Sequence, residues 1–181
     1  MIKEQLQRIK EFEAIMLGAY PSPEHVAQMR EYFEKIGFFS APASAGHHGN
    51  YAGGLFDHSL TVTKALVSLT ERLGLPWGNK RSPYIVGMFH DLCKVDQYVE
   101  HLNGTFEYNN DLLLDGHGEK SVIMLQRYMN LTEEEMLCIR WHMGAFDEKE
   151  NWRRYTKAVE AYPTVLYTHT ADMVASQILG V

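Results

Sequence analysis

The sequence predicts a mainly α-helical domain with one small β-hairpin. Apolar residues recur at intervals of three and four along most of the chain, which is the period of an amphipathic helix. Ser-Pro pairs and single glycines mark where several of these helices begin and end. One Asn-Gly step lies between two short β-prone segments, as in tight hairpins. The chain has 181 residues without an internal repeat, low-complexity tract or linker, and we expect one domain.

Two helices are expected before residue 38. The first carries an apolar residue at every third position, which gives one buried stripe. Ser22 and Pro23 signal the start of the second, because serine caps a helix and proline fits its first turn. Gly37 is expected to end it. The two apolar stripes consist of Leu6, Ile9, Phe12 and Ile15, and of Val26, Met29, Phe33 and Ile36.

A loop and two further helices are expected next. Residues 38–54 are rich in Ala, Ser, Gly and Pro, which is typical of a loop. A third helix is predicted over residues 55–73, because Gly74 follows as a stop signal. Ser82-Pro83 opens a fourth helix, whose apolar residues are Ile85, Val86, Phe89 and Leu92.

The predicted hairpin comes after the fourth helix. The segments "YVEHL" (residues 98–102) and "TFEYN" (105–109) flank Asn103-Gly104, which has the preferred chemistry of a two-residue turn. Thr132 and Glu135 are spaced as a capping box, which marks another helix start. Helices are therefore expected near Gly116, at Thr132, near Asn151 and after Pro163.

Composition and charge exclude several classes of protein. Hydrophobic residues make up 45% and charged residues 22%, as in ordinary soluble domains. The formal charge of −6 argues against a broad basic face for nucleic acid, although a metal ion can still attract a small anion. The start "MIKEQLQRIK" resembles neither a signal peptide nor an anchor, and no stretch is apolar enough to span a bilayer. We expect a cytoplasmic protein without membrane contact.

Histidine is the unusual residue of this chain, with nine copies. Three of them, His47, His48 and His58, lie in the segment "HHGNYAGGLFDHS" (residues 47–59). The Gly53-Gly54 step permits close backbone approach or a positive φ, which would bring His58 into a crowded centre. A plain loop-to-helix turn is an equally good interpretation of this stretch taken alone.

Three later residues also have two interpretations each. His117 lies between two glycines at a predicted helix start, where it can be a cap residue or adjoin an anion site. His142 lies near a helix end, and the helix dipole alone explains a histidine there. Asp172 lies among apolar neighbours, where a carboxylate is costly unless it is paired or coordinated.

The pair His90-Asp91 is suggestive mainly because of Lys94. A histidine and a lysine four residues apart share one helix face, so we expect Lys94 to face the same cleft as His90. There it would neutralise phosphate oxygens. A solvated surface lysine is the alternative interpretation.

Taken in order, these residues form the pattern H…HD…H…H…D, which resembles the signature of the HD superfamily of mainly helical, metal-dependent enzymes. The segment "HDLCK" (residues 90–94) is similar to that family's HD-x-x-K segment. The segment "HHGNYAGGLFDHS" is similar to the stretch before the first ligand in HD domains of bacterial 3′-to-5′ exoribonucleases. The resemblance covers residues 46–178. It implies a single HD domain over residues 1–181, with 1–45 as accessory helices and 46–178 as a metal-binding core.

The resemblance also implies a metal centre. It would hold two divalent transition-metal ions, for which Fe, Mn, Ni, Co and Zn are all compatible with histidine and aspartate ligands. Asp91 is the candidate bridge between the ions and a candidate catalytic residue. Lys94 is the second catalytic candidate, and it would hold phosphoryl oxygens together with His48. The implied metal ligands are His58, His90, Asp91, His117, His142 and Asp172.

Three functions are compatible with such a centre. The favoured one is a phosphohydrolase that uses metal-activated water to cleave a phosphomonoester or phosphodiester, in a nucleotide or short oligonucleotide. The alternative is a diiron HD-type oxygenase that splits a C–C or C–P bond with O₂. A non-catalytic module that only retains the metal site ranks last, because no ligand of the pattern is missing. The expected partner is a small phosphorylated substrate, whose identity depends on the loops at 38–54, 93–115 and 144–151.

Overall fold

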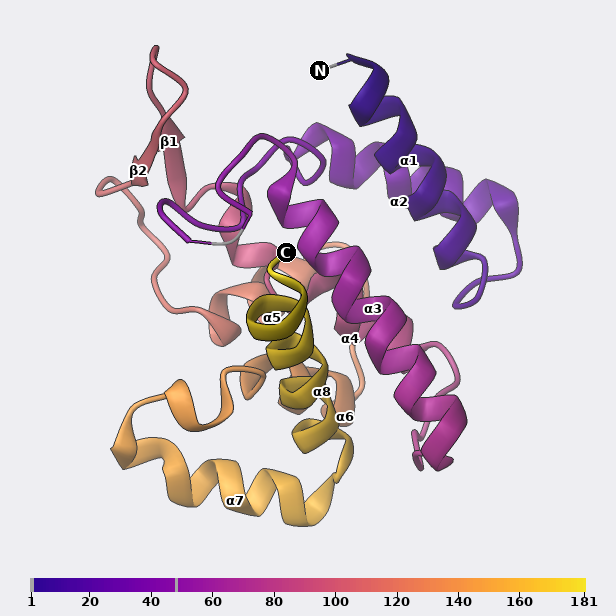
Figure 1. Cartoon of the computed structure of the whole chain (residues 1–181). Coiled ribbons are helices and arrows are strands. Elements are labelled where there is room, and N and C mark those ends of the chain that lie inside the picture. Colours follow the sequence, from indigo (N-terminus) through magenta and orange to yellow (C-terminus); the bar gives the residue numbers. More distant parts are fainter. Residues whose placement is uncertain (1, 48) are drawn as a thin grey trace.

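Helix α3 (Gly54–Leu73) runs through the middle of the molecule and contacts α4 (Ser82–Phe89) and α8 (Thr164–Met173) (Figure 1). The computed structural model describes residues 2–47 and 49–181. This part is mainly helical with one antiparallel hairpin, which confirms the predicted fold class. The other helices are α1 (Ile2–Met16), α2 (Pro23–Lys35), α5 (Gly118–Gln126), α6 (Glu133–Arg140) and α7 (Trp152–Ala161), and the short ones are η1 (Leu92–Val95), η2 (Gly144–Phe146), η3 (Lys149–Asn151) and η4 (Val174–Leu179).

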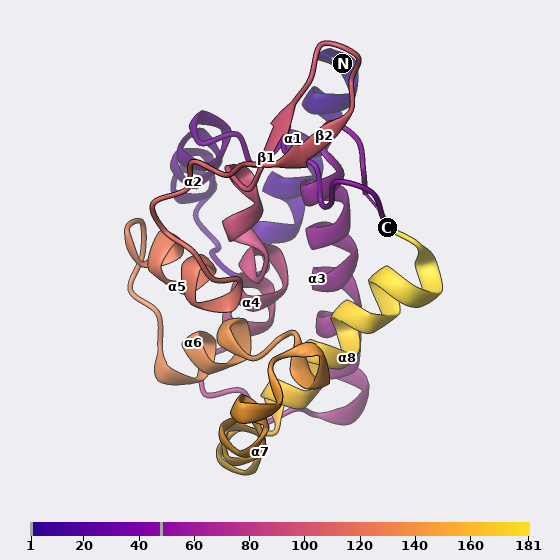
Figure 2. The same ribbon diagram turned by 90° about the vertical axis from the view of Figure 1, so that its left-hand side faces the viewer.

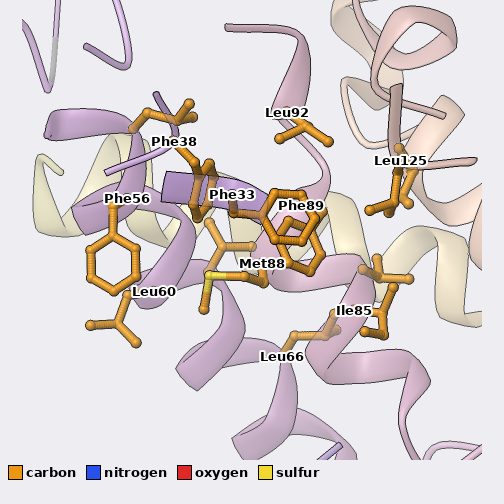
Figure 3. Close-up of a cluster of buried hydrophobic side chains, with 14 of the residues drawn as sticks. Phe33, Phe38, Phe56, Leu60, Leu66, Ile85, Met88, Phe89, Leu92 and Leu125 are labelled. Atoms are coloured by element: carbon orange, nitrogen blue, oxygen red, sulfur yellow. The ribbon is translucent and has the colours of Figure 1, made fainter. Parts of the chain in front are cut away.

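A cluster of buried phenylalanines joins the two N-terminal helices to this centre. Phe33 of α2 stacks on Phe89 of α4, with ring centroids 4.2 Å apart. Phe12 of α1 lies 6.3 Å from Phe89 in an edge-on arrangement. Such aromatic pairs add about 0.5–1.5 kcal/mol each to the free energy gained from burial alone. Helices α1 and α2 therefore share the core with α4. The division of the chain into residues 1–45 and 46–178 stays a prediction. Figure 3 shows Phe33, Phe38, Phe56 and Phe89 converging with Met88 and Leu92.

Several helices begin and end at the local sequence signals that predicted their bounds. The side chain of Ser22 accepts a hydrogen bond from the backbone N–H of His25 at 3.2 Å, and α2 begins at Pro23. Thr132 and Glu135 form the predicted capping box at the start of α6. Gly74 ends α3 in the left-handed conformation that glycine favours.

The fourth helix differs from its prediction. It was expected to include Leu92, but α4 ends at Phe89 because Asp91 adopts φ −103° and ψ 20°, outside the helical region. The chain then forms the 3₁₀ helix η1. The expectation that His90 and Lys94 share one helix face is therefore wrong, since no continuous helix joins them.

The hairpin is present, but its turn is longer than predicted. Strands β1 (Tyr98–Glu100) and β2 (Phe106–Tyr108) pair antiparallel, with Tyr98 opposite Tyr108. A two-residue turn of type I′ needs positive φ at both Asn103 and Gly104, yet of these two only Gly104 has it, at +79°. The side chain of Asn103 instead accepts hydrogen bonds from Thr105, which favours a turn spanning residues 101–105.

The C-terminal segment returns to the middle of the molecule. Helix α8 continues into η4, which has π-helical hydrogen bonding. Figures 1 and 2 show this segment beside α3, with the C-terminal residue near the start of that helix. Among residues 2–47 and 49–181, none of the helices combines the length and the apolar character that crossing a bilayer requires.

Candidate metal centre

The six residues of the predicted pattern come from five helical elements and meet at one place. Each of their side chains is within a few ångströms of at least one other member of the set. They are His58 near the start of α3, His90 and Asp91 just after α4, His117 at the N-cap of α5, His142 just after α6, and Asp172 on α8.

Asp91 lies at the centre of this group, and its two oxygens face different histidines. Oδ1 is 2.8 Å from Nε2 of His117 and 3.3 Å from Nε2 of His142. Oδ2 is 3.6 Å from Nε2 of His90 and 3.7 Å from Nε2 of His58. One carboxylate thus has a pair of imidazoles on each side, which is an arrangement that suits a ligand shared between two ions.

The donor atoms form three overlapping groups, each compact enough to surround one cation. Within each group the atoms all lie within 4.8 Å of one another. Neutral imidazoles and carboxylates are typical ligands of divalent transition metals, so these clustered side chains can bind metal ions. The groups are His58 with His90 and Asp172, His90 with Asp91 and His142, and Asp91 with Cys93 and His117.

Cys93 is the one member of these groups outside the predicted set. Its thiol lies 3.4 Å from Nδ1 of His117 and is fully buried. Burial, together with the nearby Asp91, raises the pKa of this thiol to about 12. Because the thiolate is the form that ligates metals, Cys93 is a poor ligand in this protonation state.

Backbone oxygens fix the orientation of three imidazoles. The contacts to Nδ1 are 2.8 Å for His58 with the main-chain oxygen of Val181, 2.9 Å for His90 with that of Gly87, and 2.6 Å for His142 with that of Ile139. A neutral imidazole that donates through Nδ1 carries its lone pair on Nε2. Each of these rings can therefore present a metal-binding lone pair to the centre.

The electrostatics favour the protonation states that bind metal. Burial lowers the pKa of His90 to about 4, so this imidazole is neutral at pH 7. Burial alone would raise the pKa of Asp91, but the ammonium of Lys94 and the surrounding imidazoles hold it well below its usual range. For Asp172 the effect of burial is likewise outweighed, mainly by the nearby imidazole of His58, and its pKa lies below the usual value. Neutral histidine and ionised aspartate are the states that metal binding requires.

Two buried polar atoms at the centre make no hydrogen bond of good geometry with the described residues, although one of them has Nε2 of His117 at 2.8 Å. They are Oδ1 of Asp91 and Nε2 of His142, which lie 3.3 Å apart. Most buried polar atoms in proteins are satisfied, and an orphaned one requires an explanation such as an ion. A carboxylate oxygen and an imidazole lone pair side by side are what a cation would satisfy, and the residues fit a metal on this ground.

Glycines allow the backbones that carry these ligands to approach closely. A Cβ on Gly87, three residues before His90, would lie 2.6 Å from Cα of Thr63 on α3. A Cβ on Gly118, next to His117, would lie 2.4 Å from the main-chain oxygen of Arg140 at the end of α6. Real Cβ atoms do not make such contacts. These two glycines therefore let α4 and α5 pack close enough for their histidines to reach the centre.

Lys94 reaches the centre although no continuous helix joins it to His90. Its ammonium lies 2.6 Å from Oδ2 of Asp91, and 11% of its side chain is exposed. It also lines a cavity that opens from the centre to the surface. Both Asp91 and Lys94, the two predicted catalytic residues, are thus brought together.

A cavity of about 840 Å³ opens from the centre to the surface. Asp91, Lys94, His117 and Asp172 lie at its inner end. Its lining residues come from the loop before α3, η1, the hairpin, the N-cap of α5, the segment around η2, and α8 with η4. In Figure 2 the hairpin lies at the top, α5 at the left and α8 at the lower right. His47 lines this cavity. His48, predicted to bind substrate, lies outside the described residues.

Several cavity residues were not predicted from the sequence. Tyr98, Tyr108 and Phe146 line the cavity although none belongs to the histidine pattern. His169 also lines it and contacts the main-chain oxygen of His142 through Nδ1 at 2.7 Å. A Cβ on Gly144 would lie 2.7 Å from the His169 ring, so this glycine makes room for it. The spacing of three between His169 and Asp172 is a signal that could have identified His169.

Comparisons with known proteins give one informative similarity. A stretch of 78 residues is 33% identical to the dihydroneopterin 2′,3′-cyclic phosphate phosphodiesterase of Methanocaldococcus jannaschii. The match covers 41% of this chain and 31% of that protein, so the chain spans about a third of the length of the curated relative. No family model matches the chain. No solved structure matches it either.

Proposed function

We propose that this protein is a metal-dependent phosphohydrolase that cleaves a phosphomonoester or phosphodiester bond in a nucleotide or a short oligonucleotide. The observation that carries the proposal is the buried pair of Asp91 Oδ1 and His142 Nε2, which make no well-formed hydrogen bond and of which Asp91 lines an open cavity. An ion there would meet both atoms, and a phosphate entering the cavity would reach that ion. The partial similarity to a phosphodiesterase supports the same class of reaction.

The proposed metal site uses both sides of the Asp91 carboxylate. His58, His90 and Asp172 would hold one divalent ion, and His117 and His142 the other, with Asp91 shared between them. Fe, Mn, Ni, Co and Zn all suit this mixture of imidazole and carboxylate ligands. Two bound ions would supply Lewis acidity, which makes water a stronger acid and stabilises negative charge on phosphoryl oxygens.

The chain's own residues would bind and orient the substrate. Lys94 can turn its ammonium from Asp91 toward a phosphoryl oxygen, because it already lines the cavity. His48 would hold a second oxygen, as the resemblance implies. The walls of the cavity would exclude bulk water from the phosphate and strengthen these charge interactions.

The diiron oxygenase uses the same ligand set and is the competing proposal. The named activity of the relative is the cleavage of a cyclic phosphate, which favours hydrolysis. Oxygen dependence separates the two reactions, because hydrolysis proceeds without O₂ and oxygenation does not.

The test is an anaerobic activity screen of the full chain. Protein is stripped with a chelator, reloaded with Mn²⁺, Ni²⁺, Co²⁺ or Fe²⁺, and offered nucleoside 2′,3′-cyclic phosphates, nucleoside monophosphates and dinucleotides. We expect hydrolysis of at least one class under nitrogen, with none in the stripped sample. Turnover that appears only with O₂ would replace the proposal with the oxygenase. Metal binding without turnover of any ester would favour the third function, a non-catalytic module that only retains the metal site.

A further inference from the structure

The β-hairpin presents two tyrosines to the cavity. Tyr98 and Tyr108 are opposite each other in the strand pair, with ring centroids 5.2 Å apart and planes inclined by 55°. Both line the cavity, yet 61% of Tyr108 is exposed. Burial raises the pKa of Tyr98, and the neighbouring Tyr108 and Asp91 raise it further, so its hydroxyl stays protonated beside the metal centre.

A third aromatic ring lines the same cavity from a distant part of the chain. Phe146 belongs to η2, and 68% of its surface is exposed. Its ring centroid lies 6.4 Å from that of His169, which also lines the cavity. The hairpin lies at the top of Figure 2, whereas α6, the helix before η2, lies in the lower half. Aromatic side chains from two separate segments of the chain therefore line the cavity.

Packing in the hydrophobic core does not explain the presence of these three aromatic rings. The hydrophobic core contains other aromatic residues, but Tyr98, Tyr108 and Phe146 do not belong to it. The cavity, at about 840 Å³, is also far larger than a phosphate group requires and is within the size range of sites for whole small molecules. Exposed aromatic faces beside such a cavity are typical of surfaces that stack on flat ring systems.

We propose that Tyr98, Tyr108 and Phe146 form an aromatic subsite that binds the planar heteroaromatic ring of the substrate, while its phosphate lies at the metal centre. This inference rests on the proposed phosphohydrolase function and identifies the part of the molecule that selects the ester. The amide side chains of Gln97 and Gln177 line the same cavity. Each carries both donors and an acceptor, which suits the polar edge of a nucleobase or pterin-like ring.

Binding to chelator-treated protein tests the subsite without turnover. The probes are guanosine 5′-monophosphate and ribose 5-phosphate, which share the phosphate and sugar but differ in the ring. We expect the nucleotide to bind at least tenfold more tightly by calorimetry. In Tyr108→Leu and Phe146→Leu this preference should fall about tenfold, within the range measured when one base-stacking aromatic is removed. Tyr108→Phe should keep it, because the ring remains.

Trp152→Leu is the matched control, since Trp152 is exposed on α7 and is not among the residues that line the cavity. Its preference for the nucleotide should equal that of the unaltered protein. Equal binding of the two probes, binding of neither, or a preference that survives both leucine variants would overturn the subsite. Hydrolysis of the same two esters is measured separately, on protein reloaded with metal. The binding results therefore do not decide whether the protein is a phosphohydrolase.

Discussion

The ammonium of Lys94 lies 2.6 Å from Oδ2 of Asp91, while Oδ1 of the same carboxylate faces His117 and His142. The two oxygens of Asp91 therefore have different surroundings. The lysine compensates the buried negative charge on one side, and on the other side Oδ1 and His142 Nε2 make no hydrogen bond of good geometry with the described residues. Asp91 is thus held ionised by Lys94 with one oxygen still available to a cation.

Replacement of Lys94 by methionine should slow turnover and leave metal binding intact. Methionine keeps most of the length of the side chain without its charge, and bound cations would still neutralise Asp91. Loss of one group that stabilises developing negative charge costs roughly a hundredfold in kcat. The checks are elemental analysis and initial rates on the same preparation. Loss of metal from Lys94→Met would mean that the lysine supports the ligands and does not bind the phosphate.

Asp91→Asn should reduce metal affinity and hydrolysis together. The amide has nearly the same shape as the carboxylate, so the fold should persist by circular dichroism, but the charge shared by both proposed ions is gone. Loss of even an outer-shell partner costs about 10–100-fold in affinity or activity, and a shared ligand should cost at least that. Asp111→Asn, in an exposed loop, is the control. Wild-type turnover in Asp91→Asn would remove Asp91 from the mechanism.

Gly87→Ala should destabilise the fold and loosen the centre. The new Cβ would lie 2.6 Å from Cα of Thr63, so α4 must move away from α3. Overpacking of this kind costs about 1–3 kcal/mol in the free energy of unfolding, which urea denaturation measures. Gly46→Ala is matched to it, because a Cβ at Gly46 would have nothing within 4 Å. Equal stability of the two variants would show that the close helix contact is unimportant.

Arg81→Met should cost more stability than loss of a surface ion pair. Glu135 is fully buried and accepts hydrogen bonds from Arg81 at 3.1 and 3.0 Å and from Ser82 at 3.0 Å. Removal of the guanidinium leaves a buried charge uncompensated, at a cost of about 3 kcal/mol. Arg30→Met, which removes a more exposed partner of Glu34, should cost about 1 kcal/mol or less. Similar losses in both variants would contradict this assignment.

The fold was predictable wherever a short segment decides its own conformation. Ser22-Pro23 and the Thr132–Glu135 box begin helices by satisfying backbone N–H groups locally, and both predictions are confirmed. The break after Phe89 was missed because the apolar pattern continues through Leu92 while the backbone turns at Asp91. That turn depends on contacts made by distant parts of the chain, for example the hydrogen bond that Cys93 N–H donates to Ser121.

The chemistry of the site was predictable from the sequence, but the aromatic residues that line its cavity were not. Histidine and aspartate at the six positions indicated metal ligation through a family resemblance, and the structure brings all six side chains together. Their roles as ligands stay predictions. Tyr108 and Phe146 carry no comparable signal, because a tyrosine in a hairpin and a phenylalanine in a loop have many uses. Only the packing of the hairpin and η2 around the centre makes them cavity residues.

The most direct test of the metal centre is a titration of chelator-treated protein with Mn²⁺, in which bound metal and hydrolysis of one phosphate ester are measured on the same samples. We predict that binding saturates at two ions per chain and that hydrolysis rises from zero as the sites fill. Two results would contradict this account. One is hydrolysis at the full rate in the metal-free sample, and the other is a protein that binds no Mn²⁺, Co²⁺, Ni²⁺, Zn²⁺ or Fe²⁺.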